Sequence, residues 1–407
     1  MGIGRSKNEE TFGRKNGLKL ENMAKKMAKR KVAIIAGSRG EYGYFRPVIK
    51  EIIKRPNLDY GIIVTNMHVL DSFGSTIDEI KKDCFKIHAE IFNTFDGYNR
   101  LTMVKSLSVF KMQLPEILKQ MGADMILLGG DRGEQLMAAI VGAYMYIPTA
   151  HIQAGEVSGN IDGVTRHAIT KFAHLHFTSN EDAKERVLKM GEEPFRVFNV
   201  GAPQLDDLIN GEITSSREIY NKLGLENGKP ILILAQHPVT EEFDEAESQM
   251  EETLKAVVKF EYPTIVILNN SDAGGRAIKN AINRFRKPFM KIFPSIPRKD
   301  YAGLLNIAGA VIGNSSSGIL EAPSFELPAV NIGNRQAGRI QSKNVINVPH
   351  SAPKIENAIK LALSKEFRKK IKGCTNPYGD GKSAKRIVDV LENIPIDNKL
   401  LIKKLTY

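Results

Sequence analysis

Short β-branched runs alternate with stretches of helical periodicity along most of the chain, and this alternation restricts the fold more than any other feature. Runs with the character of strands occur at residues 32–36, 61–65, 125–128, 147–152, 176–179, 196–200, 231–235, 264–268, 310–312 and 329–332. A strand, a helix and a second strand in succession place both strands parallel in one sheet, and the helices then cover its faces. We therefore predict an α/β protein built from doubly wound, Rossmann-like sheets.

Helical periodicity is clear in two stretches of the first half. One follows the first strand and has apolar residues at i, i+3, i+4, i+7 and i+8: Phe45, Val48, Ile49, Ile52 and Ile53. We expect Pro47 in the first turn of this helix, where its missing N–H leaves no hydrogen bond unmade. The other stretch has an apolar face made of Leu136, Ala139, Ile140 and Ala143.

The length of 407 residues is sufficient for two domains. A polar segment with Gly and Pro at 201–230 interrupts the pattern, and we place the domain boundary at about residue 205. The prediction is a basic, poorly ordered extension at 1–30, a first domain at 31–205, a second at 206–385 and a C-terminal tail or helix at 386–407. Open α/β sheets bind ligands beyond the carboxyl ends of their strands, so we expect a ligand in the cleft between the domains.

The formal net charge is +12, and ten Lys or Arg against three Glu place +7 of it in residues 1–31. The remaining body is mildly basic, which suits an anionic small molecule. No zinc-finger spacing or aromatic-rich basic stripe supports nucleic-acid binding, and no apolar run reaches the ~18 residues of a membrane span. Cys84 and Cys374 form neither a disulfide framework nor a thiolate metal site, so we predict reduced thiols in a cytoplasmic protein.

The segment "AGSRGEYGYFRP" follows the first strand. Its glycines, Gly37, Gly40 and Gly43, predict a flexible turn into a helix N-terminus, where free N–H groups favour an anion. Arg39 adds guanidinium donors that suit a phosphate. The spacing matches neither the dinucleotide fingerprint nor a P-loop, so an ordinary strand-to-helix turn is the alternative.

Two further loops of the first half carry charged residues. Asp131 and Arg132 follow the third strand, and Glu134 after them suits the positive end of the next helix. The fourth strand leads into a loop and helical turn that concentrate polar and titratable side chains: His151, Gln153, Glu156, Asp162, Arg166, His167 and Lys171. So many titratable groups in one segment indicate a functional site. Because the strands are consecutive, we expect their two loops side by side at the cleft.

Polar residues also follow two strands of the second half. Gln236 and His237 come directly after residues 231–235, and Asn270 and Asp272 come after residues 264–268. In a parallel sheet these positions lie at the edge where ligands bind.

A Gly/Ser loop with Ser315 and Ser316 opens a predicted helix, with Glu321 one to two turns into it. Arg335 follows the next strand. Serine donors at a helix N-terminus beside an arginine suit a diphosphate, and the carboxylate of Glu321 suits both hydroxyls of a ribose. Simple N-capping by the two serines is the alternative.

Several of these motifs are long and keep their order: "SRGEYG", "GGDRGE", "HIQAGEVSGNIDGVTRHAITKFAHLHF", "QHPVT", "NNSDAGG" and "GNSSSGILEAPSFELPAVNIGNRQAGR". With them, the region from about Lys31 to Arg386 resembles the hydrolysing UDP-N-acetylglucosamine 2-epimerases. The similarity is greatest to the sialic- and legionaminic-acid branch and to the epimerase half of the bifunctional animal epimerase/kinase. The resemblance implies two glycosyltransferase-B-like domains with the sugar nucleotide between them, in a homodimer or homotetramer.

The resemblance also implies a reaction that feeds nonulosonic acid synthesis. A base removes the proton on C2 of the sugar while UDP leaves from C1 by anti elimination, and water adds to the 2-acetamidoglucal intermediate. The products are UDP and free N-acetylmannosamine, or a 2,4-diacetamido-trideoxy analogue. The expected partner is a UDP-sugar, with no nucleic acid, membrane, cofactor or metal.

Site residues follow from the resemblance by motif. Substrate contacts would be Arg39, Arg132, Gln153, Asn270, Ser315, Ser316, Glu321 and Arg335. Acid/base candidates would be Asp131, Glu156, Asp162, Arg166 and, near the diphosphate, His237. Much of the family has a glutamate with a proposed catalytic role where this chain has Gln153, which cannot be a base. Either Glu156 or Asp131 takes that proton, or Gln153 contacts a different sugar substituent. We take Asp131 and Glu156 as the principal pair.

Three other functions stay open. A non-hydrolysing epimerase would return the UDP-linked epimer in place of free sugar. A glycosyltransferase of the same fold would need an acceptor, and a nucleotide-sugar sensor would bind without turnover. The residues leave open the substituent at C4 of the sugar and the choice between UDP and GDP.

Overall fold

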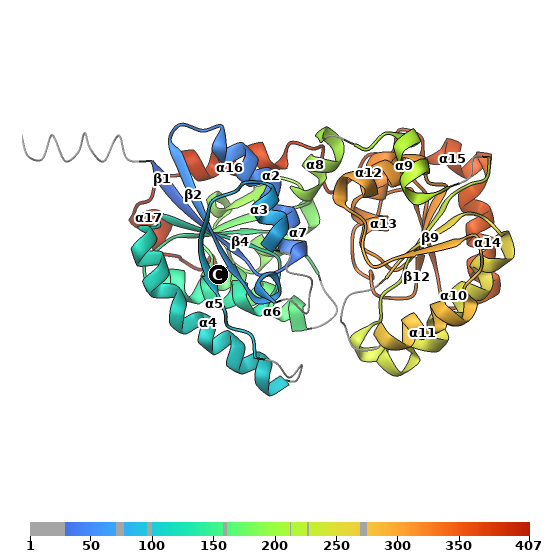
Figure 1. Cartoon of the computed structure of the whole chain (residues 1–407). Helices are drawn as coiled ribbons and strands as arrows, with labels where there is room; N and C mark the ends of the chain where they lie inside the picture. Colours follow the sequence, from blue (N-terminus) through green and yellow to red (C-terminus); the bar gives the residue numbers. More distant parts are fainter. Residues whose placement is uncertain are drawn as a thin grey trace, which may run out of the picture.

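The computed structural model describes residues 29–70, 77–95, 100–157, 161–211, 213–225, 228–268 and 275–407. Two parallel sheets, one of seven and one of six strands, form the centres of two lobes that lie side by side in Figure 1. The predicted pair of doubly wound α/β domains is thereby confirmed. Among the described residues, no helix has the length and apolar character needed to cross a membrane.

The first sheet has the strand order β3-β2-β1-β4-β5-β6-β7. Its strands are β1 (Arg30–Ala36), β2 (Leu58–Thr65), β3 (Ile87–Ile91), β4 (Met125–Gly129), β5 (Thr149–Ile152), β6 (Leu175–Thr178) and β7 (Val197–Asn199). The associated helices are α2 (Arg39–Ile53), α3 (Ile77–Lys82), α4 (Arg100–Met121), α5 (Gly133–Tyr144), α6 (Ile161–Phe172) and α7 (Glu181–Lys189). Strand order reverses between β1 and β4, and such a reversal opens a crevice at the carboxyl ends of the strands.

The second sheet repeats the arrangement with the order β10-β9-β8-β11-β12-β13. Its strands are β8 (Leu232–Ala235), β9 (Thr264–Ile267), β10 (Met290–Phe293), β11 (Ala310–Gly313), β12 (Ala329–Ile332) and β13 (Val345–Val348). The associated helices are α9 (Ser216–Leu223), α10 (Ala246–Val257), α11 (Gly275–Phe285), α12 (Arg298–Ile307), α13 (Ser317–Leu320), α14 (Ala352–Leu363) and α15 (Lys365–Ile371). The reversal here lies between β8 and β11, whose following loops contain His237 and Ser315.

Alternate side chains of β1 point to opposite faces of the first sheet, and each face has its own hydrophobic core. Val32 and Ile34 pack in one cluster with Phe45 of α2, whereas Ile35 packs in another with Phe110 of α4. Both clusters are excluded from water, which is the main source of stability of such a sheet.

Helix α2 differs from its predicted form. It begins at Arg39, so Gly40 and Gly43 lie within the helix and not in a flexible turn. Pro47 is inside the helix and not in its first turn, and Ile53, predicted to pack inward, is 57% exposed. The helix starts early because Ser38 caps it, well before the apolar pattern that begins at Phe45.

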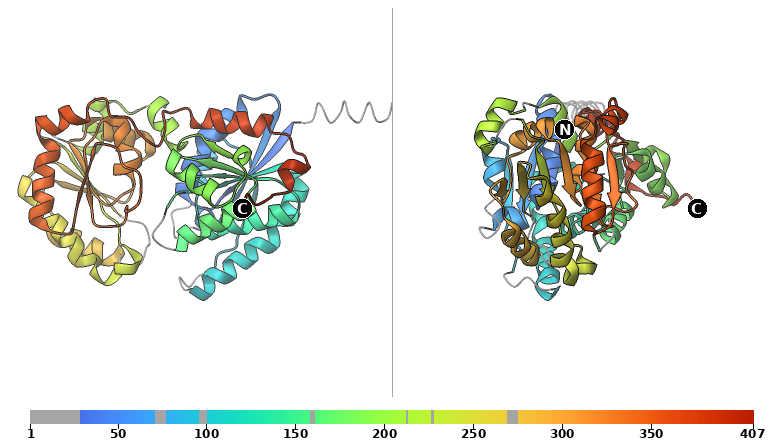
Figure 2. Two further views of the ribbon diagram at one scale, coloured as in Figure 1. Left: turned by 180° about the vertical axis from the view of Figure 1, so that it is seen from behind. Right: turned by 90° about the vertical axis from the view of Figure 1, so that its right-hand side faces the viewer.

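The chain crosses between the lobes at α8 (Gln204–Asn210) and again before α16 (Ser383–Asn393). An apolar cluster joins α8 to the second lobe: Ala202, Leu205, Leu208, Ala302, Ile319 and Tyr378. Helix α16 then packs against α2, and Figure 2 shows the red C-terminal helices divided between the lobes. The Asp206 carboxylate accepts hydrogen bonds from the N–H groups of Ser383 (3.1 Å) and Ala384 (2.7 Å), which caps α16.

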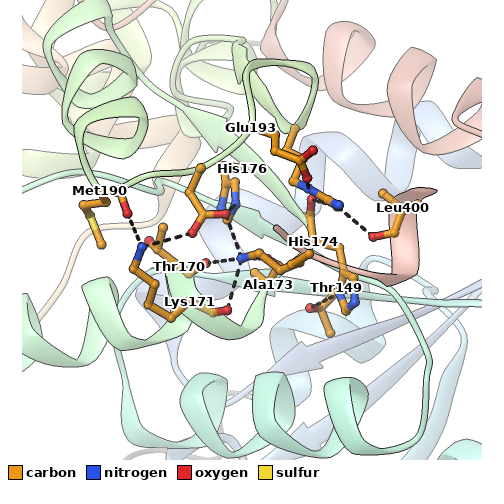
Figure 3. A network of polar contacts seen from close by, with 12 residues as sticks. Thr149, Thr170, Lys171, Ala173, His174, His176, Met190, Glu193 and Leu400 are labelled. Atoms are coloured by element: carbon orange, nitrogen blue, oxygen red, sulfur yellow. Dashed lines mark hydrogen bonds and ion pairs between the residues drawn. The ribbon is translucent and has the colours of Figure 1, made fainter. Parts of the chain in front are cut away.

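Two cationic side chains, one half-buried and one fully buried, attach the C-terminal segment to the first lobe in the polar network of Figure 3. Lys403 Nζ lies 2.7 Å from Glu192 Oε2 and donates to three carbonyl oxygens where α6 ends: those of Thr170, Lys171 and Ala173. The fully buried Arg196 donates to carbonyls at α17 (Asn398–Leu401): those of Lys399, Leu400 and Ile402. The C-terminal segment is therefore part of the first lobe.

Candidate functional site

Glu41 organises the turn after β1. Its Oε2 accepts hydrogen bonds from the backbone N–H groups of Gly37 (2.8 Å) and Ser38 (3.0 Å). Two N–H groups of the predicted anion-binding turn are thus bonded to a carboxyl group of the chain itself. Burial raises the pKa of Glu41 to about 8, against the opposing effect of Arg132. The side chain of Arg39 lies outside the described residues.

Arg166 joins the loops that follow β4 and β5. Its Nη1 donates to the carbonyl oxygen of Gln153 at 2.8 Å, and its Nη2 is ion-paired with Asp131. The Arg166 side chain is only 3% exposed. The two loops therefore lie side by side, as predicted, and the structure brings Asp131, Gln153 and Arg166 together.

Both loops begin with a residue in the left-handed backbone region. Gly130 has φ of 78° and Gln153 has φ of 62°, which is strained for a residue with a Cβ atom. The buried His151 Nε2 donates to the carbonyl oxygen of Gly130 at 2.6 Å. Burial lowers the pKa of His151 to about 3, so the imidazole is neutral and connects the two loops through this hydrogen bond.

Glu156 is a buried carboxyl group in the loop after β5. It is 6% exposed, and its Oε1 accepts a hydrogen bond from Asn180 Nδ2 at 2.7 Å. Burial raises the pKa of Glu156, although Arg166, Arg339 and Arg186 oppose the shift. A carboxyl group in this situation can hold a proton at higher pH than an exposed one. The side chain of Asp162 lies outside the described residues.

Arg339 shows that the second lobe faces this loop. It follows β12, yet its charge opposes the rise in the pKa of Glu156 and the rise in the pKa of Tyr44, and both of these residues belong to the first lobe. Such effects require short separations because water screens charges that lie further apart.

In the second lobe, Asn314 holds the loop of His237. The His237 N–H donates to Asn314 Oδ1 at 2.7 Å, and Asn314 Nδ2 donates to the His237 carbonyl oxygen at 2.8 Å. The carbonyl oxygen of Asn314 accepts from Arg335 Nη1 at 3.1 Å and from Gln336 Nε2 at 2.9 Å. Burial, with help from Arg335, lowers the pKa of His237 to about 4, so its ring is neutral at pH 7.

The Ser-rich loop leads into the short helix α13. Ser316 is the N-cap residue but makes no side-chain capping bond, and Ser315 Oγ accepts from the Ser317 N–H at 3.4 Å. Glu321 directly follows the helix. Its Oε2 accepts from Ser317 Oγ at 2.6 Å, and its Oε1 lies 3.6 Å from Arg298 Nη1. The simple capping alternative for Ser316 has no side-chain bond to support it.

One predicted contact, Asn270, lies outside the described residues, and one cavity of the structure lies away from the predicted residues. A cavity of about 670 Å³ opens where the chain crosses between the lobes, lined by Asn199, Gly201, Asn376 and Asp380 among others, and no predicted site residue lines it. Within the described ranges, no group of three His, Cys, Asp or Glu side chains is placed to hold a metal ion.

Three residues that interact with the predicted site were missed in the sequence. Asn180 lies two residues after β6, just as Asp131 lies two residues after β4, so the rule that selected Asp131 would also have selected Asn180. Asn314 and Arg339 lie within the quoted motifs "GNSSSG" and "GNRQAGR". The hydrogen bonds of Asn314 with His237, and the effect of the Arg339 charge on Glu156, depend on the packing of loops, which no motif displays.

Comparisons with known proteins agree with this geometry. The family described as UDP-N-acetylglucosamine 2-epimerase matches residues 50–392. The chain belongs to the UDP-N-acetylglucosamine 2-epimerase family. A relative from Legionella pneumophila, named UDP-N,N'-diacetylbacillosamine 2-epimerase (hydrolyzing), is 36% identical over 92% of this chain and 98% of its own. A Neisseria meningitidis relative named UDP-N-acetylglucosamine 2-epimerase is 31% identical over 82% of this chain and 88% of its own.

Solved structures of the epimerase family share the fold. A Neisseria meningitidis UDP-GlcNAc 2-epimerase, crystallised with UDP-GlcNAc, superposes with a TM-score of 0.76 at 18% identity, covering 89% of this chain and 99% of that one. A Methanocaldococcus jannaschii UDP-GlcNAc 2-epimerase in complex with UDP-GlcNAc and UDP gives 0.72 at 20% identity, over 89% and 99% of the two chains. The resemblance seen in the motifs is therefore confirmed at the level of family and fold.

Proposed function

We propose that this epimerase-family enzyme converts a UDP-linked 2-acetamido sugar into UDP and the free sugar inverted at C2. The proposal rests above all on the arrangement around Arg166, which places Asp131 beside the loop that carries the buried Glu156. Two carboxyl groups in unlike environments can divide the roles of base and acid. The hydrolysing activity printed in the names of the Legionella and Campylobacter jejuni relatives supports the same reaction.

Asp131 is assigned as the base of the first step. The ion pair with Arg166 holds the Asp131 side chain in a fixed position, from which it would accept the proton of C2. The electrons of the C2–H bond form the C1=C2 double bond, the C1–O bond breaks, and UDP leaves with that bonding pair. The sugar is then a 2-acetamidoglucal.

Glu156 is assigned as the acid of the second step. Burial raises its pKa, which favours the protonated form that the step needs. Glu156 gives its proton to C2 on the face opposite to Asp131, while water adds to C1 and releases its own proton to solvent. Exchange with solvent then returns Glu156 to the acid form and Asp131 to the carboxylate. Asp162 is retained as a further proton-transfer candidate.

The second lobe is assigned to the nucleotide. The neutral His237 and the cation of Arg335 would stabilise the diphosphate as charge develops on it, together with Ser315 and Ser316. Glu321 would accept the ribose hydroxyls. Arg39, Arg132 and Asn270 complete the proposed contacts by motif.

Gln153 is proposed to select the sugar of the substrate. Its amide side chain can donate and accept hydrogen bonds but cannot remove a proton. We propose that it contacts an acetamido group at C4, so that UDP-2,4-diacetamido-2,4,6-trideoxyglucose is the substrate. The names of the Legionella pneumophila and Campylobacter jejuni relatives, at 36% and 32% identity, support this class of sugar.

A panel of sugar nucleotides tests the proposal: UDP- and GDP-linked N-acetylglucosamine and the 2,4-diacetamido analogue. Products are followed by proton NMR in heavy water. The expected result is free sugar plus UDP from the UDP-linked diacetamido compound, with deuterium at C2. Recovery of a nucleotide-linked epimer would indicate the non-hydrolysing reaction. Absence of turnover without an acceptor would indicate a glycosyltransferase.

We also propose a homodimer formed through helices α4, α5 and α6. Helix α5 packs between the other two, and the three helices expose large apolar side chains to solvent: Leu101, Val104, Met112, Tyr144, Ile161 and Val164. On α4, Leu101, Val104 and Met112 lie on one face of the helix, and contiguous apolar patches on soluble proteins mark interaction sites. Figure 1 shows these helices on one side of the first lobe.

Light scattering coupled to gel filtration tests the dimer. The wild type should have twice the mass of the chain, and Val104→Glu should halve it at micromolar concentration. Leu361→Glu changes an exposed leucine of α14 in the second lobe and should leave the mass unchanged. A monomeric wild type, or a dimeric Val104→Glu variant, would rule out this interface.

We infer a cytoplasmic location from the thiols. Cys84 and Cys374 are both free, and unpaired thiols persist in a reducing compartment. Fractionation of the source cells with an antibody against the protein tests this, and recovery outside the cytoplasm would contradict it.

A further inference from the structure

Helix α12 holds the nucleotide-side carboxylate Glu321 from two directions. Arg298, the first residue of the helix, places Nη1 3.6 Å from Glu321 Oε1. Tyr301, one turn later, forms a hydrogen bond with Ser317 Oγ, which in turn is bonded to Glu321 Oε2 at 2.6 Å. Neither Arg298 nor Tyr301 belongs to a motif of the family resemblance quoted above.

The direction of the hydrogen bonds between these residues is determined by their chemistry. A carboxylate only accepts, so Ser317 must use its single hydroxyl proton on Glu321. Ser317 Oγ can then only accept from Tyr301, so the tyrosine hydroxyl is the donor. Burial raises the pKa of Tyr301, which keeps that proton in place. The chain of donors therefore ends on Glu321 and holds it as an acceptor.

This arrangement leaves Glu321 able to bind a diol. A carboxylate has about four acceptor sites, two on each oxygen. Arg298 faces one oxygen and Ser317 binds the other, so each oxygen keeps one site for a further donor. Two acceptors fixed side by side on one plane match the two neighbouring hydroxyls of a ribose.

Arg298 is itself anchored to the segment that connects the lobes. Its Nη2 donates to the carbonyl oxygen of Gln204 on α8. Its Nε is buried and has no hydrogen-bond partner among the described residues. A buried donor without a partner lowers stability, so stability alone does not explain an arginine here. The fork geometry of a guanidinium explains it, because one nitrogen can bind α8 while another faces Glu321.

We propose that Arg298 is a positioning residue for ribose recognition: it orients Glu321 from the connector α8, with Tyr301 as a second support acting through Ser317. The proposal rests on the proposed role of Glu321 at the nucleotide. It goes beyond that role because it assigns the discrimination between ribose and deoxyribose to residues that do not touch the sugar.

Calorimetric titration of the full chain with UDP and with 2'-deoxy-UDP tests the proposal without any turnover. The wild type should bind UDP about tenfold more tightly than 2'-deoxy-UDP, the factor expected for one hydrogen bond to a charged group. Arg298→Met should lower affinity for UDP about tenfold and leave affinity for 2'-deoxy-UDP within about twofold. Tyr301→Phe, which keeps the ring and removes the donor, should reduce the discrimination about threefold.

Arg284→Met is the matched control, since Arg284 is another arginine of the second lobe that pairs with carboxylates, here Glu247 and Glu251. It should keep wild-type discrimination. Equal losses for both nucleotides in Arg298→Met, or unchanged discrimination in both α12 variants, would overturn the proposal. If Arg298→Met does not fold, the proposal stands or falls on whether Tyr301→Phe reduces the discrimination between UDP and 2'-deoxy-UDP. Discrimination that follows the prediction in an enzyme without hydrolysing activity would count against the proposed function and not against this role.

Discussion

The buried Arg166 and the half-buried Asp131 form an ion pair that links helix α6 to the loop after β4, and the same guanidinium binds the Gln153 carbonyl oxygen at 2.8 Å. One side chain therefore links the loop after β4 to the loop after β5, the two loops to which the proposed acid and base belong. Its own position depends on α6, whose C-terminus is held by Lys403.

Arg166→Lys tests this link. A lysine keeps the charge but cannot bind Asp131 and the Gln153 carbonyl oxygen together, because its single nitrogen lacks the fork of a guanidinium. We expect kcat to fall about 100-fold, whereas the affinity for UDP, measured by calorimetry, stays within about twofold. A variant with normal kcat would remove Arg166 from any role in positioning Asp131.

Asp131→Asn and Glu156→Gln together distinguish the proposed roles of the two carboxyl groups. If Asp131 is the base, the variant should lose more than about 1,000-fold in kcat and should no longer exchange the C2 proton with heavy water. Glu156→Gln should instead slow hydration, so that the glucal intermediate accumulates and is detected by NMR. Normal deuterium incorporation at C2 by Asp131→Asn would exclude Asp131 as the base.

Gln153→Glu tests the choice of sugar. The two side chains are nearly equal in shape, so the strained backbone at φ of 62° is unaffected. Loss of the amide donor should lower kcat/KM for the diacetamido substrate relative to UDP-N-acetylglucosamine by about tenfold. Comparison of the two substrates under identical conditions gives this ratio directly, and an unchanged ratio would show that Gln153 does not contact the C4 substituent.

Glu41→Gln should change how stability depends on pH. Burial raises the pKa of Glu41 from 4.5 to about 8 in the folded state. The folded protein therefore holds this proton where the unfolded chain has lost it, and the stability gained is complete below pH 4.5 and is lost as pH rises to about 8. Between pH 5 and 8, the free energy of unfolding of the wild type should fall by on the order of 3 kcal/mol more than that of the variant.

Urea unfolding at several pH values measures this difference, with Glu116→Gln on the surface of α4 as the control. Parallel pH profiles for wild type and Glu41→Gln would contradict it.

Lys403→Met tests the attachment of the C-terminal segment. Methionine has a similar length but leaves three carbonyl oxygens at the end of α6 without this donor, and Glu192 without one of its cations. We expect a loss of about 3 kcal/mol in unfolding free energy, as for other broken buried ion pairs. Lys404→Met, which changes the exposed neighbour, should have little effect in thermal unfolding. Equal melting temperatures for the two variants would show that the contacts of Lys403 contribute nothing.

The strands absent from the prediction share one property. β3, β10 and β13 are all edge strands, and each is only partly buried. Their residues therefore lack the continuous apolar run that marks the interior strands, such as the fully buried β4. A run of apolar residues in the sequence indicates a buried strand, and the strands at the edge of a sheet are the least buried.

Helix α2 shows a different limit. Its apolar residues Phe45, Val48, Ile49 and Ile52 were correctly predicted to be buried. Its first turn was not recognised, because Ser38 and Glu41 form a capping box within a segment that we interpreted as a flexible anion-binding turn. Capping residues and ligand-binding residues have the same polar character, and only their contacts distinguish them.

The sequence alone determined the two parallel sheets and the strand ends at which Asp131, Gln153, His237 and Ser315 lie, because periodicity and turn residues act over short distances along the chain. The tertiary structure decided which of these groups meet. It paired Asp131 with Arg166, 35 residues away, and brought Arg298 next to Glu321. It also decided that a carboxyl group of the chain, Glu41, binds the N–H groups of Gly37 and Ser38. Such partnerships depend on how helices pack on the sheets and how the second lobe faces the first, which no local pattern encodes.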